Sequence, residues 1–294
     1  MATLPVQAVP KPTPALKNIL FATDFSDASM AAFPYAAALG QKFGAAVYPC
    51  HMITPTSLVA AAPQAAPYLY EAEREAAEKQ LEAVLRSPQL KGLRTKSLLS
   101  SGLLRDCLVD EIDNNKIDLV VAGTHGRTGW RRLLLGSAAE EICRSATCPV
   151  LTVGPDLPRL PVAFRRILVP TDLSDESMRS LPFVVKLASA YDAAVVVLHI
   201  LPEETAGNPD AKKLSEPVLK SMVHIFEPQL EPLKTEFMIE AGETVETILR
   251  VARDKKVDLI AMGIRSAFLP GFNLRTSVAY RVTAASYCPV LTCR

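Results

Sequence analysis

Apolar runs alternate with amphipathic segments along the first half of the chain. The apolar runs are short and rich in residues that favour strands, whereas the segments between them carry apolar positions at helical spacing. Continuous apolar strands separated by amphipathic helices indicate a mostly parallel sheet that helices cover on both faces. The predicted strands are residues 18–24, 45–53, 117–124 and 148–154, and the predicted helices are residues 27–44, 68–87 and 103–116.

The same order of segments occurs twice, which indicates a tandem duplication. KNILFATDFSDASMAAFPYAAAL in the first copy aligns with RRILVPTDLSDESMRSLPFVVKL in the second, with Asp24 opposite Asp172 at an offset of 148 residues. CPVLTV from Cys148 aligns with CPVLTC from Cys288 at an offset of 140 residues, so the second copy is eight residues shorter between these points.

Each copy is expected to form an α/β domain: an open sheet of about five mostly parallel strands flanked by helices, as in Rossmann-like folds. Residues 1–16 are predicted to be a flexible Pro-rich tail, 17–154 the first domain, 155–164 a linker and 165–294 the second domain. The prolines of the linker suit a semi-rigid connector. In such a sheet the ligand lies beyond the carboxyl ends of the strands.

Composition narrows the class of protein. The 294 residues are 49% hydrophobic and 21% charged, and the net charge of +1 does not favour nucleic acid or an anionic membrane as a partner. No apolar run reaches the length of about 18 residues that a membrane span needs. The six cysteines form no Cys-x-x-Cys pair and have no histidine at ligand spacing, so neither a disulfide framework nor a zinc site is expected. Most cysteines are predicted to be buried, and the cytoplasm is the expected compartment.

A glycine-rich segment with several arginines, GTHGRTGWRRLLLGSAAEEI at residues 123–142, follows an apolar strand. It contains neither a P-loop nor the Gly-x-Gly-x-x-Gly pattern of dinucleotide sites. Backbone N–H groups in such a turn can surround an anion, and the helix that starts near Gly136 adds donors, with Ser137 and Glu140 as a candidate capping box. From the residues alone, phosphate binding and a simple surface turn remain alternatives, and a lone His125 is more typical of a surface or packing residue than of a catalytic one.

The spacing Gly123-x2-Gly126-x9-Gly136-Ser137 resembles the nucleotide-binding signature of the ATP-binding branch of the universal stress protein family. The segments ILFATDFSDAS, CHMI and ATCPVLTVG match the same family in the same order, and the resemblance extends over about residues 17–154 and 164–294. It implies that each half has an adenine nucleotide alpha hydrolase-like fold. It also implies that the first half binds ATP, ADP or AMP together with magnesium.

The resemblance implies roles for individual residues. Asp24 corresponds to the carboxylate on the adenosine side, and the backbone of Met52 to the groups that recognise the adenine edge. The glycines would face the ribose and the phosphates, and the helix start would hold the later phosphates. For Asp24, a role in the turn before the next helix is the alternative. The candidate nucleotide-binding residues are Ala22, Thr23, Asp24, Met52, Gly123, His125, Gly126, Arg127, Gly136, Ser137 and Ala138.

The second copy departs from this signature, because two of its three glycines are replaced. Each replacement adds a Cβ where the backbone would have to approach phosphate closely. We therefore predict that the second half binds nucleotide weakly or not at all, although Asp172 is retained. A different ligand near Arg265 and Arg275, or a partner packed on the apolar FLPGF loop, remains an alternative. The aligned pairs are Gly123 and Gly263, Gly126 and Ser266, Gly136 and Thr276, and Ser137 and Ser277.

These observations favour an ATP-binding regulatory stress-response protein with little or no nucleotide turnover. No segment supplies both a base that orients water and a dedicated magnesium carboxylate, and the SGGxDS-like loop of related adenylating enzymes is missing. No catalytic residue and no protein metal site are therefore assigned. The alternatives are a scaffold without a working nucleotide site and a slow ATPase or adenylating enzyme. The resemblance also implies that the two halves pack through their last strands as a pseudo-dimer, and a homodimer of chains remains an option.

Overall fold

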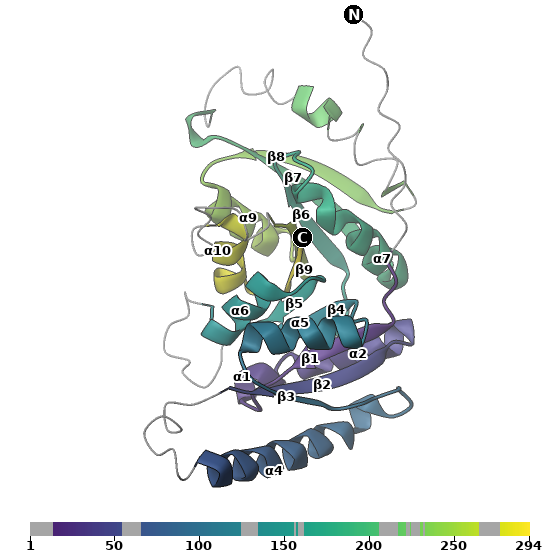
Figure 1. Ribbon diagram of the computed structural model, residues 1–294. Helices are drawn as coiled ribbons and strands as arrows, with labels where there is room; N and C mark the ends of the chain where they lie inside the picture. Colours follow the sequence, from purple (N-terminus) through teal and green to yellow (C-terminus); the bar gives the residue numbers. More distant parts are fainter. Residues whose placement is uncertain are drawn as a thin grey trace, which may run out of the picture.

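The computed structural model describes residues 14–54, 66–124, 135–155, 157, 162–205, 217–221, 224, 230, 231, 233–264 and 277–294. Figure 1 shows the strands of the two halves running side by side, with helices packed along them. The elements of the first half are β1 (Asn18–Ala22), α1 (Asp27–Met30), α2 (Phe33–Phe43), β2 (Ala46–Ile53), α4 (Ala66–Leu85), η1 (Pro88–Leu90), β3 (Leu98–Ser101), α5 (Leu104–Asn114), β4 (Leu119–Gly123), α6 (Ser137–Ser145) and β5 (Val150–Val153). Those of the second half are β6 (Arg166–Thr171), η2 (Ser177–Ser180), α7 (Leu181–Tyr191), β7 (Ala194–Leu201), η3 (Glu203–Thr205), β8 (Thr235–Ala241), α9 (Thr244–Asp254), β9 (Leu259–Gly263), α10 (Val278–Ala285) and β10 (Val290–Cys293).

The strands form one ten-stranded sheet in the order β3-β2-β1-β4-β5-β10-β9-β6-β7-β8. Every pairing is parallel except the one between β5 and β10. The predicted α/β architecture with mostly parallel strands is therefore confirmed. In each half the strand order reverses beside the first strand, between β1 and β4 and between β6 and β9, and such a reversal opens a crevice at the carboxyl ends of the strands.

The two halves join through their last strands, as the resemblance implied. Val150, Leu151 and Thr152 of β5 pair antiparallel with Thr292, Leu291 and Val290 of β10. The threonine hydroxyls reinforce the pairing, since Thr152 donates to the carbonyl of Val290 at 3.0 Å and Thr292 to that of Val150 at 3.4 Å. The two five-stranded sheets are thereby continuous, and the edge that each would expose alone is covered.

Aromatic and basic side chains at the ends of α2 and α7 pack reciprocally at the same junction. Lys42 lies over the ring of Tyr191, 5.0 Å from its centroid, and Lys186 lies 5.5 Å from the centroid of Phe43. The Tyr191 ring also meets Phe164 edge-on at 5.2 Å. Because each cation comes from one half and its aromatic partner from the other, these contacts fix how the halves sit relative to one another.

The predicted helix at residues 27–44 is two helices, α1 and α2, and the prediction of one continuous helix is wrong. Pro34 lies in the first turn of α2. A proline has no backbone N–H and its ring clashes with the carbonyl four residues earlier, so it begins a helix and does not continue one. Gly44 ends α2 with φ of 62°, which is the left-handed conformation that glycine favours.

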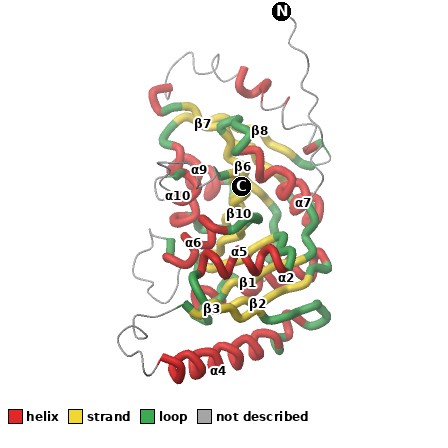
Figure 2. Tube along the Cα trace, viewed as in Figure 1, coloured by secondary structure: helices red, strands yellow, loops and turns green. Residues whose placement is uncertain are grey.

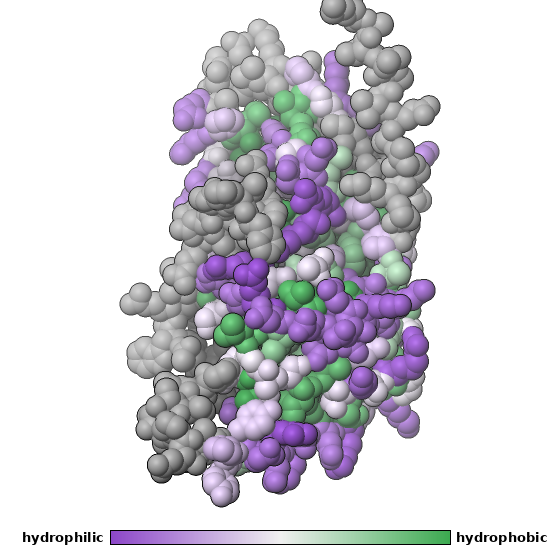
Figure 3. All heavy atoms as spheres, in the orientation of Figure 1, coloured by the Kyte–Doolittle hydropathy of each residue, from purple (hydrophilic) through white to green (hydrophobic). Residues whose placement is uncertain are grey.

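Helices cover both faces of the sheet and bury a continuous core (Figures 1 and 2). On one face, α2 and α7 pack on a single apolar cluster that runs through both halves, from Leu16 to Cys293. The opposite face has one cluster under α5 and α6 and another under α9 and α10. Tyr280 of α10 belongs to the cluster of the first half, so this face also connects the two halves. Figure 3 shows polar residues gathered over α5 and α4, on their exposed sides.

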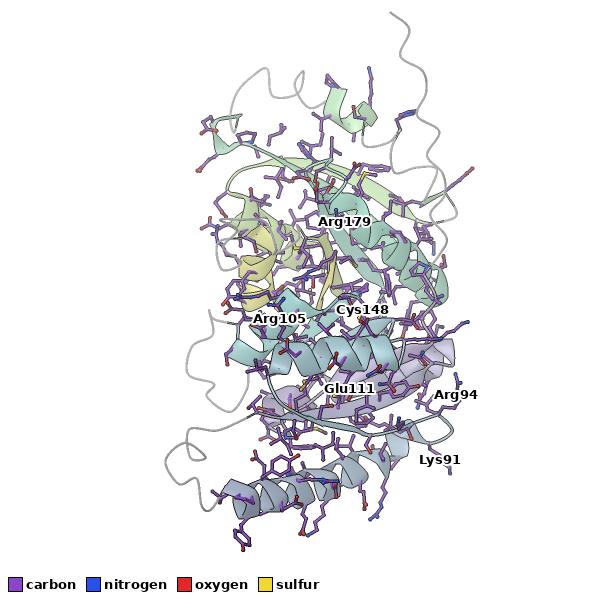
Figure 4. All side chains as sticks on the ribbon, in the orientation of Figure 1. Lys91, Arg94, Arg105, Glu111, Cys148 and Arg179 are labelled. Carbon is purple, nitrogen blue, oxygen red and sulfur yellow. The ribbon has the colours of Figure 1, made fainter. Side chains whose placement is uncertain are left out.

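Hydrogen bonds attach α5 to the sheet edge. Glu111 of α5 accepts from the hydroxyl of Ser100 in β3 and from Nδ2 of Asn115, the latter at 2.8 Å, and Figure 4 shows it on the side of α5 toward the strands. The polar contact fixes the position of α5 over β3, and with it the start of the helix at the rim of the sheet. The six cysteines are free thiols, and all except the half-buried Cys148 are buried, which confirms the prediction for most of them.

Candidate functional site

A cavity of about 190 Å³ lies in the first half at the carboxyl ends of β1, β2 and β4. This is the rim at which the strand order reverses between β1 and β4. Ala138, Ala139 and Ile142 of α6 form one wall, and Leu104 at the start of α5 lies on the other side. The predicted site residues that line this cavity are Ala22, Thr23, Asp24, Met52, Gly123 and Ala138.

The other predicted site residues lie elsewhere along the same segment. Gly136 and Ser137 are at the start of α6, immediately before the lining residue Ala138. His125, Gly126 and Arg127 lie outside the described residues, so their predicted roles stay predictions.

Asp24 holds the turn that follows β1. Its Oδ1 accepts hydrogen bonds from the backbone N–H of Ser26 at 3.0 Å and from the Ser26 hydroxyl at 2.6 Å. The Ser26 hydroxyl accepts from the N–H of Ser29 at 3.1 Å and caps α1. The turn role that the sequence left open for Asp24 is therefore real. Asp24 also lines the cavity, and its ligand role stays a prediction beside the turn role.

Thr23 connects β1, α1 and β2 at the wall of the cavity. Its hydroxyl lies 2.9 Å from that of Ser29 and accepts the N–H of Phe25 at 2.9 Å. Its carbonyl accepts from Nδ1 of His51 at 2.8 Å, and because a carbonyl can only accept, Nδ1 carries the proton. Phe25 has φ of 62°, unusual for a side chain of this size, and its ring lies 4.6 Å from the His51 ring.

Gly123 lines the cavity, but its lack of a side chain is required by a neighbouring helix. A Cβ at this position would lie 2.5 Å from the carbonyl oxygen of Ala28 and 2.8 Å from Cα of Ser29, both in α1. At Gly263 in the second half, a Cβ would overlap the carbonyl of Glu176 in the same way. Retention of this glycine in both halves is therefore explained by packing and by itself says nothing about a nucleotide.

Helix α6 starts differently from the prediction that Ser137 caps it. Gly136 is the N-cap, with φ of −60° and ψ of 149°, and Ser137 is the first helical residue. The reason is that the N–H of Gly136 donates to the carbonyl of Thr124 at 2.7 Å, which holds Gly136 extended at the helix boundary. Since glycine has no side-chain acceptor, the first turn of α6 has no side-chain cap.

Met52 lies where the sequence placed it, at the end of β2. The last residue of β2 that pairs with β1 is Cys50, which is opposite Ala22, and the N–H of Thr23 donates to its carbonyl at 2.9 Å. Backbone groups of alternate strand residues face the same neighbouring strand, so those of Met52 point past the end of β1. The geometry therefore leaves the Met52 backbone directed into the crevice.

His51, Leu104 and Cys50 are among the lining residues to which the sequence assigned no role in binding. For His51 the sequence did carry a signal, because His199 aligns with it. The structure shows that Nδ1 of His199 makes the equivalent hydrogen bond, to the carbonyl of Thr171 at 2.9 Å. Leu104 had none, since only the packing of α5 brings it to the cavity. Burial, with a smaller contribution from Glu111, raises the pKa of the Cys50 thiol far above its ordinary value, so this thiol is protonated and inert at neutral pH.

The second half repeats the geometry and has a cavity of about 410 Å³ in the equivalent place. Oδ1 of Asp172 accepts from the N–H of Ser174 at 3.0 Å and from its hydroxyl at 2.5 Å, as Asp24 does with Ser26. The helix start differs. Ser277, not the residue before it, is the N-cap of α10, and its hydroxyl accepts the N–H of Tyr280 at 3.2 Å. The start of α10 therefore has a side-chain cap, whereas the start of α6, one aligned position earlier, has none.

The hydrogen bonds in the turn at Asp172 predict that the stability of the folded protein depends on pH. Burial opposes ionisation, but hydrogen bonds from Ser174 and Ser177 lower the pKa of Asp172 below its ordinary value of 3.8. A carboxyl with a lowered folded-state pKa contributes stability that is present above the unfolded-state pKa and is lost as the pH falls through the folded-state value. We expect Asp172→Asn to reduce the loss of stability below about pH 4, measured as the urea midpoint against pH. If the urea midpoint of the variant fell with decreasing pH as steeply as that of the wild type, the prediction would be contradicted.

The described residues contain neither a metal-binding cluster nor a membrane-spanning helix. No group of three or more His, Cys, Asp or Glu side chains within them is arranged to hold a metal ion. None of their helices has the length and apolar character needed to cross a bilayer.

Comparison with known proteins assigns the chain to a family. The sequence profile of the universal stress protein family matches residues 15–154 and again residues 163–294. A universal stress protein of Methanocaldococcus jannaschii is 31% identical over 138 residues, which cover 47% of this chain and 81% of that protein. A universal stress protein of Synechocystis sp. is 24% identical over 301 aligned positions, covering 95% of this chain and all of the relative.

The fold is also similar to that of a solved structure of the family. The crystal structure of a universal stress protein from Archaeoglobus fulgidus superposes with a TM-score of 0.75 at 19% sequence identity, and the match covers 94% of this chain and 98% of that one. At this identity the likeness concerns the fold alone. Together with the two profile matches, it shows that this chain belongs to the universal stress protein family, as a tandem member with two copies of the family's domain.

Proposed function

We propose that this protein is an ATP-binding regulatory protein of the stress response, and that it holds the nucleotide in its first half with little or no turnover. One observation carries the proposal: the uncapped start of α6 lies directly beside the cavity that Asp24 and Met52 line. A helix start without a side-chain cap favours phosphate, and the cavity offers an apolar pocket for a ring. Family membership supports the stress-response role.

The parts of the nucleotide would be held by different groups of the rim. The cavity of about 190 Å³ is smaller than the roughly 300–1,000 Å³ of typical ligand pockets, so it would enclose only the nucleoside part. The Met52 backbone would face the base, and the carboxylate of Asp24 would accept from ribose hydroxyls. The phosphates would extend past Gly123 to the start of α6.

A positively charged side chain lies at the same rim. Arg105 is exposed on the first turn of α5, at the end of the helix that Figure 4 shows beside α6. Magnesium, when bound, would neutralise the phosphate oxygens and take its remaining ligands from water.

The described part of the cavity also supports binding without catalysis. Its ionisable side chains are those of Asp24, His51 and Cys50. Asp24 accepts from Ser26, His51 donates its Nδ1 proton to Thr23, and the Cys50 thiol is protonated. These side chains are therefore already engaged or neutral within the described part of the cavity.

We propose the cytoplasm as the location, because a nucleotide ligand and free thiols are both compatible with it.

The first test is equilibrium binding of ATP to the full chain, with absorbance at 260 nm of the denatured protein as a check for co-purified nucleotide. Ala138→Val, which introduces the residue found at the aligned position 278, adds branched bulk at the first turn of α6. We expect binding at least ten-fold weaker, equivalent to about 1.4 kcal/mol.

Val278→Ala is the matched control and is expected to leave the ATP affinity of the first half unchanged. A chain that binds no adenine nucleotide would favour the scaffold alternative. Steady-state ATP turnover that is lost in Asp24→Ala would instead favour the enzyme alternative.

A further inference from the structure

We propose that the cavity of the second half is a second binding site, which accepts an uncharged purine nucleoside and rejects its phosphorylated forms. The choice of a nucleoside rests on the proposed function in one respect, because the two cavities arose by duplication and the first is assigned to a nucleotide. The selectivity against phosphate rests on the second cavity alone.

The second cavity has the size and walls of a ligand site. Its volume of about 410 Å³ falls within the range of roughly 300–1,000 Å³ that small-molecule pockets occupy. Ile200, Ile248 and Met262 give it an apolar wall, and the hydroxyls of Thr244 and Ser277 lie among its polar lining groups. An apolar wall with a few polar groups suits a planar ring that carries hydroxyls or amines.

The place where the first half would receive phosphate is altered by side chains. Ser277 caps α10, and its hydroxyl occupies the N–H of Tyr280 at 3.2 Å. Val278 follows, where the first half has the smaller Ala138. A phosphate would therefore compete with the Ser277 hydroxyl for the N–H of Tyr280 and would have to fit beside a β-branched side chain. The Ser277 cap and the Val278 side chain thus disfavour a phosphate at this helix start, although the cavity stays open.

Electrostatics act in the same direction. Among the described residues that line the cavity, the ionisable side chains are Asp172 and Glu176, and both are acidic. Glu176 stands where the first half has Ala28, so this charge is an addition of the second half. A phosphate bound near these carboxylates would meet like charge, which is unfavourable at short distance. A neutral nucleoside does not meet this repulsion.

The same carboxylates can recognise a neutral ligand. Oδ1 of Asp172 is engaged by Ser174, and the carboxylate retains further acceptor capacity for hydroxyl or amine donors. Hydrogen bonds from Ser174 and Ser177 outweigh burial and lower the pKa of Asp172, so it remains an acceptor at neutral pH. We therefore expect the rim of the second half to accept hydrogen bonds from a neutral ligand and not to hold an anion.

The two cavities can be observed separately in the full-length protein. Met52 lines the first and Met262 the second, so their methyl resonances report on one site each in protein labelled with [methyl-13C]methionine. Met52→Leu and Met262→Leu assign the two signals. The probes are adenosine, AMP and ATP. We expect adenosine to shift the Met262 methyl signal saturably, and ATP to require at least a ten-fold higher concentration for the same shift.

Two variants at aligned positions separate the sites. Thr244→Trp fills the second cavity and is expected to abolish the Met262 response to adenosine, while Met52 still responds to ATP. Leu104→Trp is the counterpart in the first cavity and is expected to do the reverse. Glu176→Ala, which restores the residue of the first half, should narrow the preference for adenosine over AMP.

The outcomes are distinct. A Met262 signal that does not move with adenosine at millimolar concentration would overturn the proposal, whatever Met52 does. A Met262 signal that responds to ATP as readily as to adenosine would overturn the selectivity. A Met52 signal that ignores ATP would contradict the proposed function of the first half and leave the second-half result to be judged by itself.

Discussion

Replacing Gly263 by alanine is expected to lower the free energy of unfolding by about 3 kcal/mol, the largest single-residue effect on stability that we predict. A Cβ at this position would overlap the carbonyl oxygen of Glu176 and lie 2.7 Å from its carbonyl carbon and 2.9 Å from Cα of Ser177. These are backbone atoms of the turn that follows β6, so they cannot rotate away as a side chain would. The turn must shift or the strand must bend.

Gly123→Ala is the matched comparison in the first half and is expected to cost less, about 1–2 kcal/mol, because its closest contact is the carbonyl oxygen of Ala28 at 2.5 Å. Urea denaturation of both variants measures the difference. A control at Gly44, where an added Cβ meets nothing within 4 Å but φ is 62°, isolates the cost of a left-handed conformation from that of crowding. If Gly263→Ala unfolded at the wild-type midpoint, the close approach of β9 to this turn would be refuted.

Asp24→Ala is expected to weaken ATP binding by roughly 100-fold, equivalent to about 2.7 kcal/mol, and is the largest effect on affinity that we predict. The substitution removes the acceptor that holds Ser26 and also removes the carboxylate from the cavity wall. Loss of the turn alone would lower the stability of the first half. Loss of the carboxylate would act on the nucleotide directly. Isothermal titration of the full chain with ATP gives the affinity.

The duplicated chain provides the control for the turn. Asp172→Ala breaks the same two hydrogen bonds, to Ser174, in the second half. It should therefore lower stability by a similar amount and leave ATP affinity unchanged within two-fold. If the two variants weakened ATP binding equally, the effect of Asp24 would be one of stability, and its assignment to the nucleotide would have to be withdrawn.

The internal repeat was the most informative feature of the sequence. It predicted the architecture of each half, because apolar runs and helical spacing are local properties that the chain carries twice. It also located Asp24, Met52 and Gly123 at one rim, because residues that follow parallel strands meet at their carboxyl ends. The joining of the two halves through their last strands was implied by the family resemblance and is confirmed, and the structure shows that β5 and β10 pair antiparallel.

The details of the site could not be obtained in this way. Ser137 and Ser277 align and have the same side chain, yet Ser137 is the first residue of its helix and Ser277 is the cap. The difference at Ser137 is set by a hydrogen bond from Gly136 to Thr124, and no propensity scale contains that contact. Pro34 is the local signal for the break between α1 and α2, and helical spacing on both sides of it masks that break.

The sequence by itself determined that two copies of one α/β unit are present, which residues stand at the strand ends, and that the second copy has lost two glycines of the signature. Only the tertiary structure decided that Gly123 and Gly263 are glycines because a neighbouring turn or helix passes close, and that the second half keeps a cavity in which the described ionisable lining residues are acidic. The reason is physical. Strand and helix patterns arise from neighbours along the chain, whereas the space around a strand end is set by segments many residues away that pack there.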